Sequence, residues 1–179
     1  MVYADLHVHT RLSDGTLTLE TIPDAAEAAG VEVVGVTDHD RFHPEFDGPV
    51  VERDGVTLIH GIELRVEAAE GRVDLLGYGL ERTDALQSEV ERIQRDRRER
   101  GRAIVECVED RLGVDLGVEI REGLGRPHVA RAIEDHPDSG LDYDEAFDEL
   151  IGNDGPCFVA RDVPSFERGR ALLADACGI

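Results

Sequence analysis

Lysine is absent from this chain, and basic residues of any kind are scarce. Its 19 basic residues are all arginines, against 40 Asp and Glu, and the formal net charge is −21. A negative field of this size repels phosphate backbones and anionic lipid headgroups, which argues against general affinity for nucleic acids or membrane surfaces. Because concentrated salt screens the repulsion among such charges, we expect a salt-adapted source rather than an acidic mesophile.

Cysteine and long apolar runs are equally sparse. The three cysteines, Cys107, Cys157 and Cys177, are far apart and form no CxxC pair, which predicts reduced, semi-buried thiols. No apolar run approaches the roughly 18 residues that cross a bilayer. The N-terminal residues lack the basic region and apolar stretch of a signal peptide. We therefore expect a soluble, cytoplasmic protein. The sequence also contains no Walker loop and no nucleophile elbow.

The order of the expected elements predicts a parallel α/β fold. Apolar runs predict strands at residues 2–6, 31–36, 56–59 and 73–78, the last in a hairpin with 64–66, and an Ala-rich helix runs from about Thr21 to Gly30. Strand, crossover helix and strand again is typical of parallel sheets. After Leu80 the charged, helix-favouring sequence predicts helices at residues 83–112, 127–134, 142–151 and 165–178. We expect three parts: a strand-rich frame (1–80), a helical insertion (81–160) and a return to the frame (161–179).

Histidines and a carboxylate follow the first expected strand. His7 and His9 stand two residues apart on an extended segment, so both imidazoles project from one side and can reach one metal ion. Asp14 follows in the turn Ser13-Asp14-Gly15, which can bring its carboxylate back over the same site. Taken alone, the pair is equally well explained by one packed and one solvated histidine.

Two further expected strands end in the same manner. Thr37-Asp38-His39 closes the second and Gly61-Ile62-Glu63 the third. Parallel strands present their carboxyl ends at one rim, where α/β folds place their active sites. Mixed imidazole and carboxylate groups suit Mn²⁺, Fe²⁺ or Zn²⁺. A carboxylate such as that of Glu63 can bridge two ions about 3.5–4 Å apart.

Together these segments resemble the N-terminal motifs of the PHP (polymerase and histidinol phosphatase) superfamily. The resemblance is carried by the segments DLHVHT, SDG, TDHD and GIE, in this order and spacing. The segment Gly125-Arg126-Pro127-His128-Val129-Ala130-Arg131 is similar to one in PHP phosphoesterases that act on short nucleotides, including nucleoside 3′,5′-bisphosphate phosphatases and a 5′-to-3′ oligoribonuclease branch. The resemblance implies a PHP-type distorted (β/α)7 barrel with an inserted helical subdomain.

The resemblance also implies a ligand set for two or three divalent ions, with Mn²⁺ expected first and Zn²⁺, Fe²⁺ or Mg²⁺ as alternatives. In the family pattern, His7 and His9 hold one ion, Asp14 and His39 a second, and Glu63 bridges the first and a third.

Three more residues receive roles outside that ligand set. Asp38 is expected to orient His39. Arg126 and His128 are expected to face the phosphate or nucleotide, since Arg suits bidentate phosphate contact and Pro127 opens a helix N-terminus there. A surface ion pair remains the alternative for Arg126.

The chain departs from the family pattern in two places. Asp74 stands where the family has a histidine, which shifts the preference towards Mn²⁺ or Mg²⁺ or leaves a third site weak. Family members continue into a strand with a His-Pro ligand and later carry an Asp-x-His pair, whereas this sequence stops at Ile179 before either; His136-Pro137 is expected to be a loop residue instead. We therefore expect an N-terminal fragment of a barrel, because a half-built barrel with open edges is a poor stable fold.

We expect hydrolysis of a phosphomonoester or terminal phosphodiester by metal-activated water. The expected substrate is a small nucleotide or short oligonucleotide, with no stable binding of duplex nucleic acid. Two alternatives remain: a PHP phosphatase of another small substrate, such as histidinol phosphate, and a non-catalytic metal-binding or regulatory module. The oligomeric state is not determined by the sequence.

Overall fold

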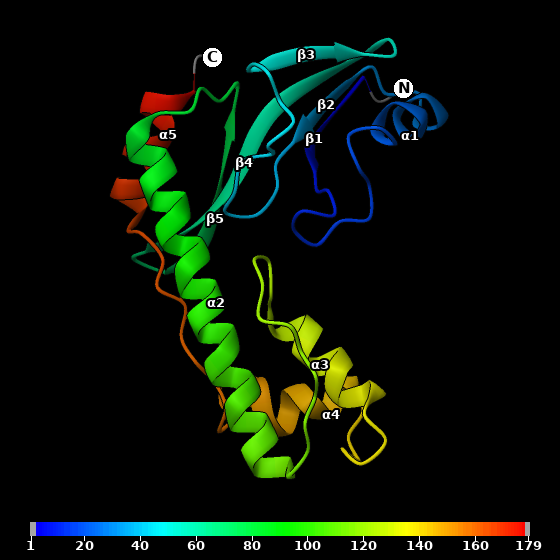
Figure 1. Cartoon of the computed structure of the whole chain (residues 1–179). Helices are drawn as coiled ribbons and strands as arrows, with labels where there is room; N and C mark the ends of the chain where they lie inside the picture. The colour runs from blue at the N-terminus through cyan, green and yellow to red at the C-terminus, as the bar shows by residue number, and fades with distance from the viewer. Residues whose placement is uncertain (1–2, 178–179) are drawn as a thin grey trace. The chain divides into compact units, whose positions relative to one another are not determined.

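The computed structural model describes residues 3–177 as an alternation of strands and helices that ends in a helical second half (Figure 1). Val2 and Gly178, where the first strand and the last helix are expected to begin and end, lie outside these residues. In chain order the elements are β1 (Ala4–Val8), α1 (Ile22–Ala29), β2 (Val33–Val36), β3 (Val50–Arg53), β4 (Val56–Ala68), β5 (Gly71–Tyr78), α2 (Asp84–Leu112), α3 (Arg126–Asp135), α4 (Tyr143–Ala146), the π-helix η1 (Phe147–Ile151) and α5 (Phe166–Ala176).

The chain divides into two compact units. Unit 1 comprises residues 1–93 and 163–179, and unit 2 comprises residues 94–162. All of the strands belong to unit 1, while α3, α4 and η1 belong to unit 2. None of the helices within residues 3–177 combines the length and the apolarity needed to cross a membrane.

Unit 1 is built on a five-stranded mixed sheet. β1, β2 and β4 are parallel neighbours, and β3 and β5 run antiparallel to β4. Parallel neighbours need a crossover connection, which α1 supplies between β1 and β2. The carboxyl ends of three strands therefore meet at one edge of the sheet. Among the described residues the strands form an open sheet, and the seven-stranded barrel stays a prediction.

The two antiparallel pairings differ in how well the sequence predicts them. The expected hairpin is confirmed, since Leu64 pairs with Leu75 and Val66 with Val73. The strand β3 was not predicted, although Asp54 and Gly55, which join it to β4, carry a recognisable signal. Both have positive φ, 50° and 83°, as a tight two-residue hairpin turn requires, and Asp-Gly is a favoured pair for that turn.

Helix α1 begins and ends where the sequence predicts. Thr21 is its N-cap, Pro23 lies in the first turn, and Gly30 ends it in the left-handed conformation with φ 68°. Its apolar side packs against β2 and β4 in one cluster, which comprises Leu19, Ile22, Ala26, Val31, Val34, Val36, Phe46, Val56 and Leu58.

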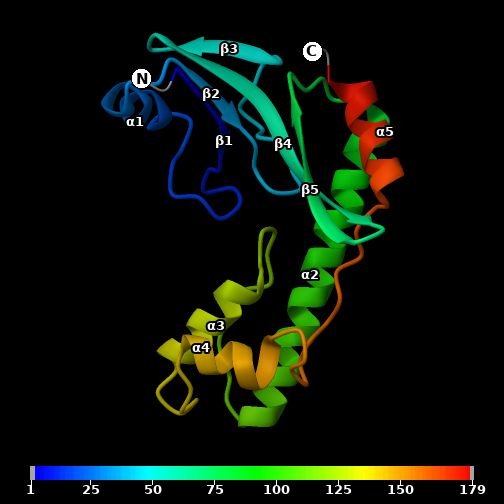
Figure 2. The same ribbon diagram turned by 180° about the vertical axis from the view of Figure 1, so that it is seen from behind.

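Helix α5 lies against the far half of β4 and against β5 (Figure 2). Ser165 caps it, because its hydroxyl oxygen accepts a hydrogen bond from the Arg168 N–H at 3.2 Å. Leu172, Leu173 and Ala176 pack with Ile62 and other β4 residues, and the first third of α2 contributes to the same cluster. This packing fixes the strand that carries Glu63.

Unit 2 has its own core and a covalent link that the sequence does not predict. Apolar side chains of α2, α3, α4 and η1 form one buried cluster, and the helical stretch expected at 142–151 is confirmed as α4 followed directly by η1. The prediction that Cys107 and Cys157 are reduced thiols is wrong. The two residues form a disulfide with Cα atoms 5.6 Å apart and a sequence separation of 50 positions, a pairing decided by the packing of unit 2. Cys177 is a free thiol.

Candidate metal centre

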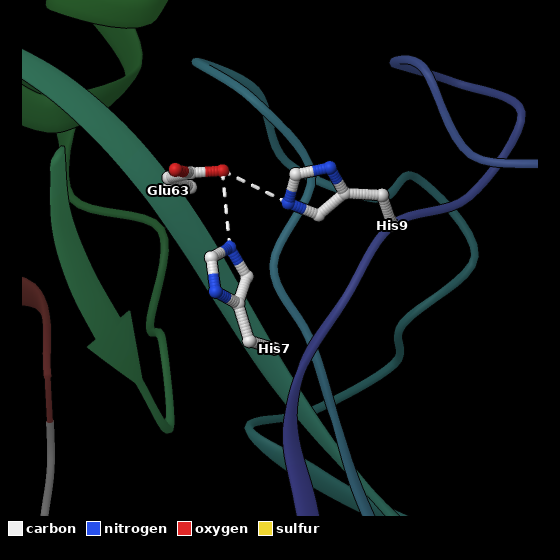
Figure 3. Close-up of side chains that lie close together, drawn as sticks. All are labelled: His7, His9 and Glu63. Carbon is white, nitrogen blue, oxygen red and sulfur yellow. Dashed lines mark ion pairs between the residues drawn. The ribbon is translucent and has the colours of Figure 1, made fainter.

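Five side chains of metal-ligating type meet where β1, β2 and β4 lie side by side. His7 belongs to β1 and His9 follows it, while His39 follows β2 and Glu63 lies within β4. A parallel bridge between His39 and Glu63 continues the pairing of β2 with β4. The close-up in Figure 3 shows His7 and His9 pointing toward the carboxylate of Glu63. The strand order thus brings together groups that are more than 50 residues apart.

The Glu63 carboxylate is the centre of the first group. Its Oε2 atom lies 3.2 Å from His7 Nε2, 2.8 Å from His9 Nε2 and 3.0 Å from His39 Nδ1. Glu63 is only 5% exposed, so three imidazoles surround one buried carboxylate oxygen. A buried carboxylate needs charged or hydrogen-bonding partners, and this one faces rings that are themselves good cation ligands.

Asp14 joins His9 and His39 in a second group. Its Oδ1 lies 2.7 Å from His9 Nδ1, and its Oδ2 lies 3.3 Å from His39 Nε2. Burial alone would raise the pKa of Asp14, but the hydrogen bond with His9 and the charges of His39 and His9 outweigh it, so the pKa is lowered. The carboxylate is therefore ionised and ready to accept a cation.

The turn that carries Asp14 is held by Asp38. The backbone N–H and the hydroxyl of Thr10 donate to the Asp38 carboxylate at 2.8 and 2.7 Å, and the Ser13 hydroxyl donates at 2.6 Å. Gly15 closes the turn, since a Cβ at this position would lie 2.0 Å from the carbonyl oxygen of His9. Asp38 is 1% exposed. Its carboxylate accepts hydrogen bonds from this turn, whereas the sequence interpretation assigned it to His39.

The backbone after β2 is fixed equally tightly. The Asp40 N–H donates to the Glu63 carbonyl at 2.9 Å, and the Glu63 N–H donates to the Asp38 carbonyl at 3.2 Å. Asp40 is fully buried with φ 51°, and its side chain accepts a hydrogen bond from the Arg65 N–H at 3.1 Å. A left-handed non-glycine residue costs energy and is retained where its surroundings enforce it, often near functional sites.

The geometry fits a divalent cation. The ligand atoms of His7, His9 and Glu63 lie within 4.8 Å of one another, as do those of His9, Asp14 and His39. His9 Nε2 and Glu63 Oε2 are buried and have no hydrogen-bond partner, although they are 2.8 Å apart. This nitrogen and this oxygen are therefore arranged like two ligand atoms that bind the same ion. Imidazole and carboxylate donors together suit Mn²⁺, Fe²⁺ or Zn²⁺.

Asp74 lies outside both groups. It stands opposite Arg65 in the pairing of β4 with β5. Arg65 Nε donates to Asp74 Oδ1 at 2.5 Å, and Arg65 Nη2 donates to Asp74 Oδ2. Burial alone would raise the pKa of Asp74, but the hydrogen bonds and charge of Arg65 lower it. The sequence interpretation missed Arg65, although its cross-strand position would have revealed it.

Arg126 and His128 lie in unit 2 and make contacts within that unit. Arg126 Nη1 donates to the Ile151 carbonyl at 3.1 Å and to Asn153 Oδ1 at 3.0 Å. His128 Nδ1 accepts a hydrogen bond from the Gly125 N–H at 3.2 Å at the start of α3. Burial, followed by the charge of Arg121, lowers the pKa of His128.

Comparisons with known proteins agree with this class of α/β domain. The PHP domain family matches residues 5–121. That range includes all five residues of the two groups and more than half of the chain. The chain belongs to the PHP domain family.

Three curated relatives are phosphoric ester hydrolases by name. A 3′,5′-nucleoside bisphosphate phosphatase of Chromobacterium violaceum is 27% identical over the whole chain. A phosphoribosyl 1,2-cyclic phosphate 1,2-diphosphodiesterase of Eggerthella lenta is 32% identical over 86% of the chain. A 5′-3′ exoribonuclease of Haemophilus influenzae is 24% identical over 72% of the chain. The chain spans 65%, 62% and 47% of the lengths of these relatives.

Two solved structures share the fold. One is an amidohydrolase from Chromobacterium violaceum, solved with bound sulfate and no metal, with a TM-score of 0.73 and 24% identity. The other is a proposed metal-dependent phosphoesterase from Bifidobacterium adolescentis, also with a TM-score of 0.73 and with 21% identity. Each alignment covers 98% of this chain and 64% of the other. At these identities the likeness shows the fold.

Proposed function

We propose that the chain acts as a metal-dependent phosphoesterase on a phosphomonoester or terminal phosphodiester of a small nucleotide or short oligonucleotide. One observation carries the proposal: three histidines and two carboxylates, from three parallel strands and the loops that follow them, form five pairs with nitrogen–oxygen distances of 3.3 Å or less. The names of the three curated relatives support the reaction class and a small phosphorylated substrate.

The proposed ligand set follows the two groups. His7, His9 and Glu63 would hold one divalent ion, and His9, Asp14 and His39 a second, with Mn²⁺ as the first candidate. Glu63 is the proposed shared ligand, because its Oε2 lies within 3.2 Å of a nitrogen of each of the three histidines.

A third ion is supported less well. Asp74 would serve it only after giving up its ion pair with Arg65.

Bound divalent ions supply an activated water and stabilise charge on the phosphoryl oxygens. The chain's own residues provide rigidity and charge. Asp38 anchors the turn that presents Asp14, and the backbone hydrogen bonds of Glu63 with Asp38 and Asp40 fix His39 beside Glu63. From unit 2 we propose Arg126 and His128 as substrate-binding residues, on the family resemblance of their segment. A guanidinium suits a phosphate because its N–H groups match the phosphate oxygens in pairs.

The ligand proposal is tested by metal content and turnover together. After metal is removed with EDTA and Mn²⁺ is added back, His9→Ala and Glu63→Gln should bind less Mn²⁺ than the wild type. Both should also lower kcat/KM at least about 100-fold, because each changes a side chain that contacts several others in the cluster. His136→Ala, in a turn of unit 2, is the matched control and should keep both. The proposal is wrong if either cluster variant keeps wild-type metal content and turnover.

A substrate panel separates the proposed activity from its alternatives. It contains a nucleoside 3′,5′-bisphosphate, a short RNA, a cyclic phosphodiester and histidinol phosphate. Fastest turnover of the bisphosphate or RNA supports the proposal, whereas fastest turnover of histidinol phosphate favours a phosphatase of another small substrate. Bound metal without hydrolysis of any substrate favours a non-catalytic metal-binding module. The ion pair of Asp74 with Arg65 favours the non-catalytic alternative, because it occupies a carboxylate that a third ion would need.

A further inference from the structure

Unit 2 holds 10 of the chain's 19 arginines, although acidic residues outnumber them within the unit. Arg97 and Arg100 are three residues apart on α2, so they lie on the same side of the helix. Arg126 is the first residue of α3. Arg161 lies in the segment between η1 and α5.

Two contacts bring these segments together. The Asp162 N–H donates to Asp96 Oδ2 at 3.2 Å, which holds the residues around position 161 against α2. The Arg126 guanidinium lies 5.5 Å from the centre of the Phe158 ring. The segment from Phe158 to Asp162 therefore contacts both α2 and the start of α3.

Arg100 lies within this arrangement and is only 9% exposed. Its Nε–H has no hydrogen-bond partner. Burial, followed by the charges of Arg161, Arg126 and Arg97, lowers the pKa of Arg100 to about 10, and Asp96 opposes this shift only weakly. Positive charge thus outweighs negative charge around a buried donor without an acceptor, which is a costly arrangement for the protein on its own.

We propose that Arg97, Arg100, Arg126 and Arg161 form a binding site for a phosphate group, with the Arg100 Nε–H as one of its donors. A phosphate carries up to two negative charges and several acceptor oxygens, so it can satisfy several guanidinium groups at once. A carboxylate has one charge and two oxygens and satisfies fewer. Arg126 already has a proposed substrate role from its family resemblance, while the other three arginines are assigned by their structure. The site uses no residue of the metal cluster and does not rest on the proposed hydrolysis.

The test uses inorganic phosphate and the whole chain in EDTA at low ionic strength. Calorimetric titration gives the affinity, and ¹⁵N-edited NMR follows the Arg100 Nε–H resonance. Phosphate should bind and shift that resonance, and Arg100→Gln and Arg161→Gln should weaken binding at least tenfold. Arg102→Gln is the matched control, because Arg102 is exposed on the opposite side of the same helix, and its affinity should stay within twofold of wild type.

Each other outcome overturns the inference. It fails if the Arg100 resonance does not move at saturating phosphate, or if Arg102→Gln weakens binding as much as Arg161→Gln does. Equal affinity for acetate rejects the assignment to phosphate. His7→Ala locates the ligand: an equal loss of affinity in this variant would place the phosphate at the histidine cluster instead. Circular dichroism verifies that Arg161→Gln is folded. Since no metal is present, a failure of the proposed hydrolase function leaves these results unchanged.

Discussion

At the scale of single residues, a buried carboxylate outside both candidate ligand groups fixes the shape of the candidate metal centre. Asp38 accepts three hydrogen bonds from Thr10 and Ser13, and these bonds set the path of the turn that carries Asp14. Sequence reasoning selected Asp38 because it precedes His39. Its partners could not be predicted, because they lie 25 and 28 positions away in the chain.

Asp38→Asn should therefore weaken metal binding without removing a ligand. The amide oxygen can still accept from the Thr10 N–H and the Ser13 hydroxyl, but the amide NH2 then faces the Thr10 hydroxyl, which donates to Asp38 in the wild type. We therefore expect a loss of about 1–3 kcal/mol in the free energy of unfolding. We also expect roughly 10- to 100-fold weaker Mn²⁺ binding. Urea unfolding and metal titration measure the two effects. Asp24→Asn on the exposed side of α1 is the control, and equal Mn²⁺ affinity in the two variants would contradict the role given to Asp38.

His60 offers a second prediction at this scale. It is 2% exposed and stacks on the Phe46 ring at 4.5 Å. Burial, then the charges of Arg82 and His43, lowers its pKa from 6.5 to about 4. Between these values the unfolded chain binds a proton that the folded chain does not, so stability is full above pH 6.5 and falls as the pH drops towards 4.

His60→Gln should remove that share of the acid sensitivity. Between about pH 7.5 and pH 5 the wild type should lose about 2 kcal/mol of unfolding free energy more than the variant does. Urea unfolding at both pH values measures the difference, with His136→Gln as the control for a general histidine effect. Parallel pH dependence in wild type and His60→Gln would show that burial does not perturb this ring.

At the scale of elements, the regular patterns were predicted well and the irregular ones were not. The limits of α1 follow from Thr21, Pro23 and Gly30, which act on neighbouring backbone groups. The β4–β5 hairpin follows from adjacent apolar runs. β3 is only four residues long, too short for alternation of polar and apolar residues to stand out. Local sequence rules do not predict β3, because its hydrogen bonds to β4 stabilise it.

The disulfide of unit 2 is the element whose removal has the clearest consequence. Cys107 on α2 and Cys157 after η1 close a loop of 50 residues, and constraining a loop of that length stabilises by about 4 kcal/mol in the chain-entropy account. Cys107→Ser with Cys157→Ser should therefore unfold unit 2 at lower urea concentration. Tryptic cleavage within residues 94–162 reports on this unit directly. Cys177→Ser is the control, and identical cleavage rates in all variants would contradict a stabilising disulfide.

At the scale of the whole molecule, charge is the dominant property. A net charge of −21 on 179 residues gives strong self-repulsion in the compact state. Raising monovalent salt from about 0.1 M to 1 M shortens the screening length from about 10 Å to 3 Å.

We therefore expect the urea midpoint to rise with KCl over this range. Sucrose of equal osmolality controls for solvent exclusion and should leave a smaller increase. A midpoint that is flat or falls with KCl would reject electrostatic stabilisation by salt. It would also remove the reason to expect a salt-adapted source, which, like the cytoplasmic location, stays a prediction from composition.

The sequence by itself determined the family, the parallel α/β order and the ligand-type residues His7, His9, Asp14, His39 and Glu63, because each depends on short motifs and on the direction of strands. The tertiary structure alone decided that Asp38 serves the turn of Asp14, that Asp74 pairs with Arg65, that Cys107 joins Cys157 and that arginines surround Arg100. These are contacts between distant segments. Packing and the energetic cost of unpaired buried charges select the partners. Both depend on residues that are distant in sequence, so local patterns do not predict them.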